Sequence, residues 1–201
     1  FSIDQGRRLL TAAKDFGLDI NPAGRIYVPP IVHAFIGSDI TAGALACGFL
    51  EKQKPSLFVD VGTNGEMGIN NDGRFIVAST AAGPAFEGAR ISMGMLATTG
   101  AISSVQVTEG EWEYTVIGNV HPVGICGSGL IDVIALLLQE GQLGPYGEIL
   151  SGENELPLAG EIVLTQKDIQ EIQLAKAAIA TGIQLLLRKL GLENDALDRV
   201  Y

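Results

Sequence analysis

The segment Leu57–Thr80, LFVDVGTNGEMGINNDGRFIVAST, constrains the fold of this chain more than any other stretch. Three short runs follow one another with only a few residues between them, at Leu57–Val61, Glu66–Asn70 and Arg74–Thr80. Short runs bounded by Gly, Asn and Asp predict strands, and Asn-Asp-Gly before the last run is a strong signal for a β-hairpin. The sequence therefore predicts a strand–turn–strand–turn–strand unit, with Asp60 near the end of the first strand and Gly62–Gly65 as the first turn.

The rest of the chain alternates between helical and strand-like patterns. Helical spacing of apolar residues, with glycine or capping residues at the ends, predicts helices at Ser2–Phe16, Asp39–Ala46 (capped by Ser38), part of Ala82–Met95, Leu130–Gln139 and the stretch from the capping box Thr165–Asp168 to Leu190. A second hairpin is predicted from Ala101–Thr108 and Trp112–Gly118. Residues 141–160 are predicted to be an exposed loop. The predicted fold class is α/β, with two β-meanders separated by helices.

Composition excludes several classes of protein. The chain has 201 residues, of which 47% are hydrophobic and 18% charged, and its formal net charge is −10. These fractions are typical of a globular protein. Lys and Arg form no cluster, so a nucleic-acid-binding surface is not expected. No apolar run approaches the length of about 18 residues that a membrane helix needs, and no signal-peptide pattern is present.

The cysteines exclude further chemistry. Cys47 and Cys126 are the only two, and no CxxC motif occurs. This chain alone therefore cannot build a zinc ribbon or a four-cysteine iron–sulfur site. Two isolated cysteines are typical of reduced thiols, which predicts a cytoplasmic protein. Cys126 is either a small buried side chain or a reactive thiol, and its glycine-rich apolar surroundings favour the first.

Asp60 and the turn after it form the first candidate site. A carboxylate at the end of a buried strand needs a hydrogen-bond donor or a cation nearby. The turn Gly62–Gly65 offers backbone N–H groups to an anion, and Asp60 could hold magnesium through water. The alternative is a plain hairpin turn in which Asp60 caps the amide of Thr63 or Asn64.

Two glycine-rich stretches are further candidates. Gly124–Gly129 precedes an apolar helix, so it could bring backbone N–H groups close to a phosphate, or could be a simple turn capped by Ser128. The stretch Ala81–Gly88 contains Gly83, which could allow close approach of a ligand, and Glu87, which could face that ligand. Equally, Pro84 could be the first residue of a helix and Glu87 a partner of its dipole.

The strand–Asp-x-Gly-Thr-x-Gly–strand unit resembles the phosphate hairpins of the actin, hexokinase and heat-shock-chaperone ATPase superfamily. More specifically, the chain resembles the C-terminal ATPase domain of reductive activators of corrinoid proteins from about Val32 to Tyr201. Four motifs in order carry this resemblance: VDVGTNGEMG, AAGPAFEGARISMGM, GICGSGLIDVIA and LTQKDIQEIQLAKAAIATGIQLLL. The resemblance implies an actin-like (ribonuclease H-like) ATPase lobe with a mixed β-sheet, β-hairpins and flanking helices.

The resemblance also implies a domain organisation. Residues 1–55 would be a connecting segment with helices, and residues 56–201 the second lobe, cut before the final adenosine-contacting turn. A [2Fe–2S] domain and the first phosphate hairpin are expected upstream of this chain. The fragment alone is expected to be inactive.

The same resemblance assigns expected roles to individual residues. Asp60 would hold Mg²⁺ through water, and the phosphates of ATP would contact a set formed by Asp60, Gly62, Thr63, Asn64, Gly65, Glu66, Gly83, Gly127, Ser128 and Gly129. No catalytic residue is assigned. The expected cofactors are therefore ATP and Mg²⁺ in this domain, with the [2Fe–2S] cluster elsewhere in the complete protein.

The implied function is ATP-dependent reduction of cob(II)alamin to cob(I)alamin in an anaerobic cytoplasm. The expected partner is a corrinoid protein or a corrinoid-dependent methyltransferase, and the expected assembly is a homodimer. Two alternatives remain at the level of the sequence. The lobe could be a non-catalytic docking or dimerisation module, or a lobe of a small-molecule kinase in which Asp132 would be the candidate catalytic carboxylate.

Overall fold

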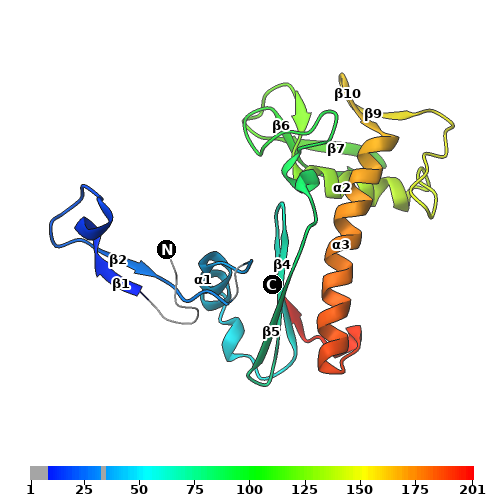
Figure 1. Ribbon diagram of the computed structural model, residues 1–201. Helices are drawn as coiled ribbons and strands as arrows, with labels where there is room; N and C mark the ends of the chain where they lie inside the picture. The colour runs from blue at the N-terminus through cyan, green and yellow to red at the C-terminus, as the bar shows by residue number, and fades with distance from the viewer. Residues whose placement is uncertain (1–8, 33–34) are drawn as a thin grey trace. The chain divides into compact units, whose positions relative to one another are not determined.

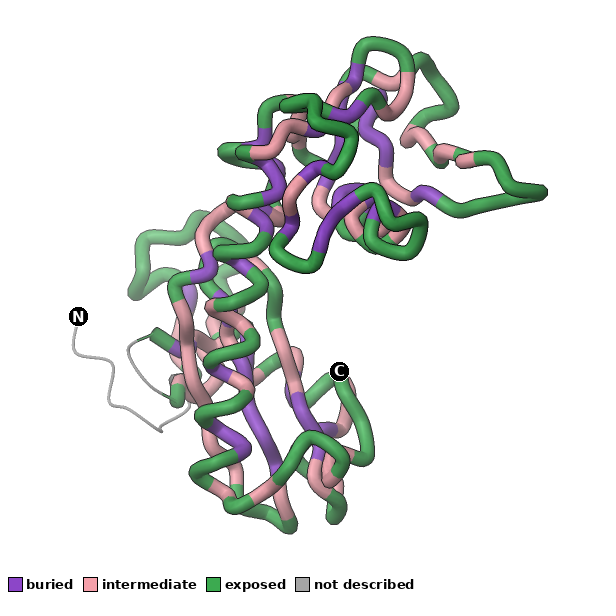
Figure 2. Tube along the Cα trace, turned by 90° about the vertical axis from the view of Figure 1, so that its right-hand side faces the viewer, coloured by how far each residue is buried: buried purple, intermediate pink, exposed green. Residues whose placement is uncertain are grey.

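The computed structural model describes residues 9–32 and 35–201, and its elements are shown in Figure 1. The chain divides into two compact units. The first unit consists of Phe1–Asp60, Glu66–Ser79 and Gly182–Tyr201, as far as these residues are described, and the second of Val61–Gly65 and Thr80–Thr181. Buried residues, purple in Figure 2, occur in both units, so each unit has apolar side chains shielded from water.

The first unit contains two sheets and short helices. Its elements are β1 (Leu9–Ala12), the 3₁₀ helix η1 (Ala13–Phe16), β2 (Arg25–Val28), α1 (Ser38–Ala46), η2 (Phe49–Glu51), β3 (Ser56–Val61), β4 (Gly65–Asn71), β5 (Arg74–Thr80), the end of α3 (Gln166–Leu190), η4 (Asn194–Ala196) and β11 (Arg199–Val200). Strands β1 and β2 pair antiparallel, and a four-stranded sheet has the order β11-β3-β4-β5.

The four-stranded sheet confirms the three predicted strands of Leu57–Thr80. The turn between β4 and β5 has Asp72 at φ 50° and Gly73 at φ 78°. Two successive residues with positive φ are typical of the type I′ turn, whose twist matches that of a hairpin. Strand β11 lies parallel to β3, with Arg199 opposite Ser56 and Val200 opposite Leu57. The sheet is therefore mixed, as the family resemblance implies.

Phe49 is at the centre of the core of the first unit. Its side chain is fully buried, and its ring lies 5.9 Å from that of Phe58, 5.6 Å from that of Phe75 and 6.1 Å from that of Tyr201. The last two pairs are edge-to-face, a favourable geometry for aromatic rings. The buried Asn70 amide donates to the carbonyl oxygens of Phe49 and Lys52, at 2.8 and 3.1 Å. These bonds fix η2 against the end of β4.

Two helix predictions in the first unit need correction. The described part of Ser2–Phe16 is strand β1 followed by one 3₁₀ turn, and residues 1–8 lie outside the described part of the chain. Pairing with β2 overrides the helical spacing in β1, since cross-strand partners satisfy its backbone. The helix α1 forms as predicted, but Gly37 is its N-cap and Ser38 is its first residue.

The second unit combines a small sheet, a hairpin and two helices. Its elements are η3 (Pro84–Glu87), β6 (Ala101–Thr108), β7 (Glu111–Val116), β8 (Gly124–Ile125), α2 (Gly127–Gln139), β9 (Glu155–Ala159), β10 (Ile162–Thr165) and the first part of α3. The strand orders are β7-β6-β8 and β10-β9. The predicted hairpin is confirmed, with Glu109 at φ 53° and Gly110 at φ 88° in its turn.

The core of the second unit forms around α2, α3 and β6. Its most buried members are apolar side chains of these elements and of β8 and β10, among them Ile102, Ile125, Leu130, Val133, Leu137, Ile162, Leu164, Ile169 and Ala175. Helices α2 and α3 end close to the predicted glycines, Gly141 (φ 67°) and Gly191 (φ 68°). Glycine adopts this left-handed conformation at little cost, and it is the usual residue just after a helix.

The start of α3 confirms the predicted capping box. The Thr165 N–H and hydroxyl both donate to Asp168 Oδ2, at 2.9 and 2.8 Å, and the Asp168 N–H donates back to Thr165 Oγ1 at 3.2 Å. Asp168 is fully buried. Its other oxygen, Oδ1, accepts from the N–H and the hydroxyl of Ser92, at 2.7 and 3.1 Å.

Two predictions in the second unit are wrong. Ala82–Met95 contains no α-helix but one 3₁₀ turn, because Gly83, Gly88 and Arg90 all have positive φ. Residues 141–160 are not simply an exposed loop. They contain β9, and Leu143, Ile149 and Leu156 are buried. Those three side chains pack into the core despite the many Gly, Pro and Glu residues around them.

In the described ranges, no helix is long and apolar enough to cross a membrane.

Candidate phosphate-binding site

The turn between β3 and β4 carries the first group of predicted site residues. It is closed by the Gly62 N–H, which donates to the Asn64 carbonyl at 3.1 Å. The Gly83 N–H donates to the Thr63 carbonyl at 2.8 Å, and the Thr80 hydroxyl donates to the Gly65 carbonyl at 3.3 Å. The turn is thus held by the end of β5 and by the segment that follows it, and Gly83 and Thr63, both in the predicted phosphate-contacting set, are brought together.

Thr63 is bonded to a carboxylate that is distant in sequence. The Thr63 N–H donates to Glu87 Oε1 at 2.9 Å. The Thr63 hydroxyl lies 2.8 Å from Oε1 and 2.7 Å from Oε2 of the same side chain. The plain-turn alternative predicted Asp60 as the acceptor of the Thr63 amide, but the acceptor is Glu87. The turn presents its donors to a negatively charged group, which is the chemistry expected of an anion site.

Glu87 is positioned by a short and strongly constrained segment. It is the last residue of η3, and Pro84 is at the start of that turn, as predicted. Gly83 has φ 81° and ψ 163°, a region of backbone conformation that is essentially restricted to glycine. Gly83 is therefore required by the path of the chain. From the sequence, Glu87 could either face a ligand or serve a helix dipole, and its bond to Thr63 could not be predicted.

The glycines at the start of α2 have a structural reason of their own. A Cβ on Gly127 would overlap the carbonyl oxygen of Phe86, and a Cβ on Gly129 would overlap that of Ile102. The first α2 amide with a helical partner is that of Leu130, which donates to the Cys126 carbonyl at 2.9 Å. The amides of Gly127–Gly129 precede this pattern, as at the start of any α-helix.

Ser128 does not cap α2. The N-cap position is Cys126, which makes no side-chain capping bond, and the Ser128 hydroxyl donates to the Ser103 carbonyl at 2.6 Å. The Cys126 thiol is buried and donates to the Ile102 carbonyl at 3.4 Å. Its burial fits the small-side-chain interpretation.

Glu87 and the start of α2 border the same cavity. This cavity has a volume of about 410 Å³, within the range of small-ligand sites. Its lining includes Glu87, Cys126, Gly127 and Ser128 together with the apolar side chains of Val61, Phe86, Met95, Leu96, Ala97 and Ile131. The structure therefore brings Gly127 and Ser128 together with the carboxylate that Thr63 binds.

Of the remaining predicted residues, Asp60 and Glu66 lie in the first unit and Gly65 in the second. Asp60 is on β3 and is exposed, so the argument from a buried carboxylate does not apply to it. Glu66 is on β4, where its Oε1 accepts from the Ser79 hydroxyl of β5 at 3.4 Å. Gly65 is buried at the start of β4. The roles of Asp60 and Glu66 toward a ligand stay predictions.

The residues present suit a loosely held Mg²⁺ better than a protein-built metal centre. Among the described residues, no three His, Cys, Asp or Glu side chains form a group that could hold a metal ion. Mg²⁺ in nucleotide sites is held by one or two carboxylates, phosphate oxygens and water, and the exposed Asp60 fits that role. A [2Fe–2S] cluster needs four Cys or His ligands, and the described residues contain no group of three or more such side chains, so they do not fit such a cluster.

Asp132 is not placed as a catalytic base. Its Oδ2 accepts from the Ser104 hydroxyl at 2.9 Å and from the Val105 N–H at 3.0 Å. The carboxylate thus binds α2 to β6, and the kinase hypothesis has no free acid at this position.

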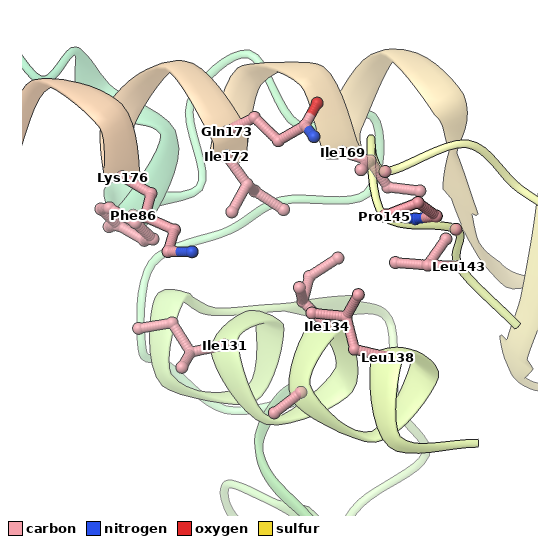
Figure 3. A pocket seen from close by; sticks show the side chains of 13 residues that line it. Phe86, Ile131, Ile134, Leu138, Leu143, Pro145, Ile169, Ile172, Gln173 and Lys176 are labelled. Atoms are coloured by element: carbon pink, nitrogen blue, oxygen red, sulfur yellow. The ribbon is translucent and has the colours of Figure 1, made fainter. Parts of the chain in front are cut away.

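A second cavity lies between α2 and the first part of α3. Its volume is about 440 Å³, and Figure 3 shows apolar side chains entering it from both helices. They include Ile131, Ile134, Leu138, Ile169 and Ile172. Lys176 is at its edge. None of the residues predicted to bind phosphate lines this cavity.

The fold and the family match define residues 54–201 as an ASKHA domain. The family described as "C-terminal domain of RACo the ASKHA domain" matches residues 54–201, and the "RACo middle region" matches residues 5–52. The chain therefore belongs to the RACo family.

Relatives with curated names agree with this membership. The chain is 39% identical to "Corrinoid activation enzyme RamQ" of Eubacterium limosum, over 92% of this chain and 35% of that protein. It is 32% identical to "[Co(II) methylated amine-specific corrinoid protein] reductase" of Methanosarcina barkeri, over 100% of this chain and 41% of that protein. A solved structure, "Reductive activator for corrinoid,iron-sulfur protein", matches with a TM-score of 0.82 and 39% identity, over 95% of this chain and 34% of that one. The chain thus spans well under half the length of these relatives.

Proposed function

We propose that this chain is the nucleotide-binding part of a reductive activator, an enzyme that returns an inactive Co(II) corrinoid protein to the Co(I) state with the help of ATP. The observation that carries this proposal is the pair of Thr63 donors, N–H and hydroxyl, bonded to an anion beside a cavity at the start of α2. Membership of the RACo family and the names of the relatives support the reaction class.

In this proposal the turn Gly62–Gly65 holds a phosphate group through backbone N–H groups and the Thr63 hydroxyl. Gly127, Ser128 and Gly129 contribute the first amides of α2, where the helix dipole favours negative charge. Asp60 holds Mg²⁺ through water, and the ion neutralises phosphate charge. Glu66 and Gly83 support the turn from the adjacent strand and segment.

The reaction needs one electron, which passes to Co(II) and leaves Co(I). We propose that a reduced [2Fe–2S] cluster outside this chain supplies it. ATP binding would favour one of two conformations of the activator, and the corrinoid protein would bind that conformation preferentially, so that the two binding events are linked. The proposed partner is a corrinoid protein or a corrinoid-dependent methyltransferase, the proposed assembly a homodimer, and the proposed location the cytoplasm.

Calorimetric titration of the complete protein with MgATP tests the nucleotide site. We expect binding in the wild type and a loss of tenfold or more in Asp60→Ala, on the order of the loss of one metal-mediated contact (about 1.4 kcal/mol per factor of ten). Asp195→Ala is the matched control, since Asp195 is an exposed carboxylate of η4. The absence of MgATP binding in the wild type would contradict the proposal.

The activation reaction is tested by absorption spectroscopy of a corrinoid protein mixed with the complete protein and a reductant. We expect conversion of Co(II) to Co(I) that depends on ATP and is impaired in Asp60→Ala. Conversion at equal rates with and without ATP would contradict the proposal that activation by this protein depends on ATP.

A further inference from the structure

The donors proposed to hold phosphate are occupied by a carboxylate of the same chain. Glu87 accepts both the N–H and the hydroxyl of Thr63, within 2.9 Å in each case. We infer that Glu87 competes with phosphate for these donors. Its carboxylate occupies the Thr63 donors when no nucleotide is bound, and phosphate displaces it on binding; we call this Thr63–Glu87 contact the latch. This inference rests on the proposed function and adds a regulatory step to the same site.

A carboxylate and a phosphate cannot share these donors. The N–H of Thr63 has one proton and its hydroxyl has one proton, and both are directed to Glu87. Hydrogen bonds to an ionised acceptor are about twice as strong as neutral ones, so the contact competes effectively. Two anions at the same donors would also repel each other. Binding of the one therefore requires departure of the other.

Displacement requires movement of a side chain alone. The backbone around Glu87 is fixed on both sides, since the Gly83 N–H donates to the Thr63 carbonyl at 2.8 Å and the Gly88 N–H donates to the Ala85 carbonyl at 3.0 Å. A Cβ on Gly88 would come within 2.6 Å of the Met95 nitrogen, so this glycine is also closely packed. Glu87 itself is exposed, and its carboxylate can rotate into water without unfolding η3.

Nucleotide binds to the molecules in which the latch is open, so the apparent affinity is the intrinsic affinity multiplied by the fraction of such molecules. It acts only on ligands that bring a phosphate to Thr63. A ligand without phosphate, such as adenosine, leaves the Thr63–Glu87 contact in place and is not affected. This difference separates the latch from a general change of the cavity.

The test is calorimetric titration of the complete protein with MgATP and, separately, with adenosine. We expect Glu87→Gln to bind MgATP about fivefold more tightly than the wild type, and Glu87→Ala about tenfold, since a charge-assisted hydrogen bond becomes a neutral one or disappears. Adenosine affinity stays unchanged. Glu140→Gln is the matched control, because the Glu140 carboxylate also accepts hydrogen bonds, from Trp112 and Gln142, but does not line the cavity.

A second measurement needs no nucleotide. Hydrogen exchange at the Thr63 amide is expected to be faster in Glu87→Ala than in the wild type, because its acceptor is lost. Unchanged exchange would overturn the latch. The latch would also be overturned if both Glu87 variants bound MgATP no more tightly than the wild type, a result that leaves the proposed function intact. A gain in adenosine affinity equal to the gain in MgATP affinity would overturn it as well. If neither the wild type nor any variant binds MgATP, the proposed function fails and the latch fails with it.

Discussion

The buried carboxylate of Asp168 binds Ser92 across a separation of 76 residues. Its Oδ1 accepts the Ser92 N–H at 2.7 Å and the Ser92 hydroxyl at 3.1 Å, while its Oδ2 serves the capping box of α3. One side chain thus fixes the start of α3 and the turn that leads to Met93 and Met95. The backbone of these two residues bonds to that of Ile125, which precedes the start of α2. Asp168 therefore stabilises the second unit from inside its core.

Replacement of Asp168 is expected to destabilise the protein strongly. Asp168→Ala leaves the N–H groups of Ser92 and Thr165 without their acceptor, and we expect a loss of about 3 kcal/mol in the free energy of unfolding. Asp168→Asn retains one oxygen acceptor and should lose about half as much. Urea denaturation measures both. The control is Glu161→Gln, an exposed position between β9 and β10, and a loss of less than about 1 kcal/mol in Asp168→Ala would contradict the expectation.

Two glycines of the candidate site are expected to respond differently to alanine. A Cβ on Gly127 would overlap the Phe86 carbonyl, whereas a Cβ on Gly62 would lie 3.5 Å from Glu87 Oε1 and 3.7 Å from the Asn64 carbonyl, ordinary contact distances. Gly127→Ala should therefore cost about 2–3 kcal/mol through displaced backbone, and Gly62→Ala less than about 0.5 kcal/mol. Thermal unfolding compares the pair. Equal melting temperatures would show that the approach of Gly127 to Phe86 is not tight.

Tyr114 is expected to make stability depend on alkaline pH. Burial, and to a lesser extent the negative charge of Glu140, raises the pKa of Tyr114 above its usual 10.0. Its neutral form therefore contributes stability that is fully present below pH 10.0. The contribution is lost as the pH rises through the higher pKa of the folded state, because the unfolded chain releases the proton first.

Comparison of urea midpoints at about pH 8 and about pH 11 measures this effect around the ordinary tyrosine pKa. Tyr114→Phe should show a smaller fall in the urea midpoint between the two pH values. At the lower pH it should lose about 1 kcal/mol in the free energy of unfolding, because it lacks the hydrogen bond that the Tyr114 hydroxyl donates to the Leu158 carbonyl at 2.8 Å. Tyr146→Phe, at a residue that is 86% exposed, is the control. An identical fall in Tyr114→Phe and wild type would be evidence against the role of Tyr114.

The two thiols are expected to differ in reactivity. Cys126 is 3% exposed, and Cys47 is half-buried. A buried thiol in apolar surroundings reacts slowly, so a thiol reagent should label Cys47 first in the folded protein and both residues equally in denaturant. Mass spectrometry of the labelled Cys47→Ser and Cys126→Ser variants assigns the two rates. Faster labelling of Cys126 than of Cys47 would identify it as a reactive cysteine after all.

The sequence predicted the elements whose signals are local. The hairpin turns at Asp72-Gly73 and Glu109-Gly110 require positive φ at both central residues, and few residue pairs allow this. The capping box of α3 and the glycines after α2 and α3 are local in the same sense. Since each of these signals depends on the conformation of neighbouring residues, it can be recognised without knowledge of the fold.

Only the tertiary structure decided which groups meet across the chain. The strand β1 formed where helical spacing was present, because β2 supplied its hydrogen bonds. Leu143, Ile149 and Leu156 entered the core from a segment that is rich in loop residues.

The same holds for the candidate site. Its turn was recognised from Asp60-Val-Gly-Thr-Asn-Gly, but the acceptor at Thr63 is Glu87, 24 residues away. The sequence by itself determined that the chain turns tightly after β3 and that few side-chain atoms occupy this turn, because the turn consists of glycines and short polar residues. That a carboxylate of the chain fills the turn depended on packing, because hydrogen-bond partners distant in sequence are selected by the folded backbone and not by local propensity.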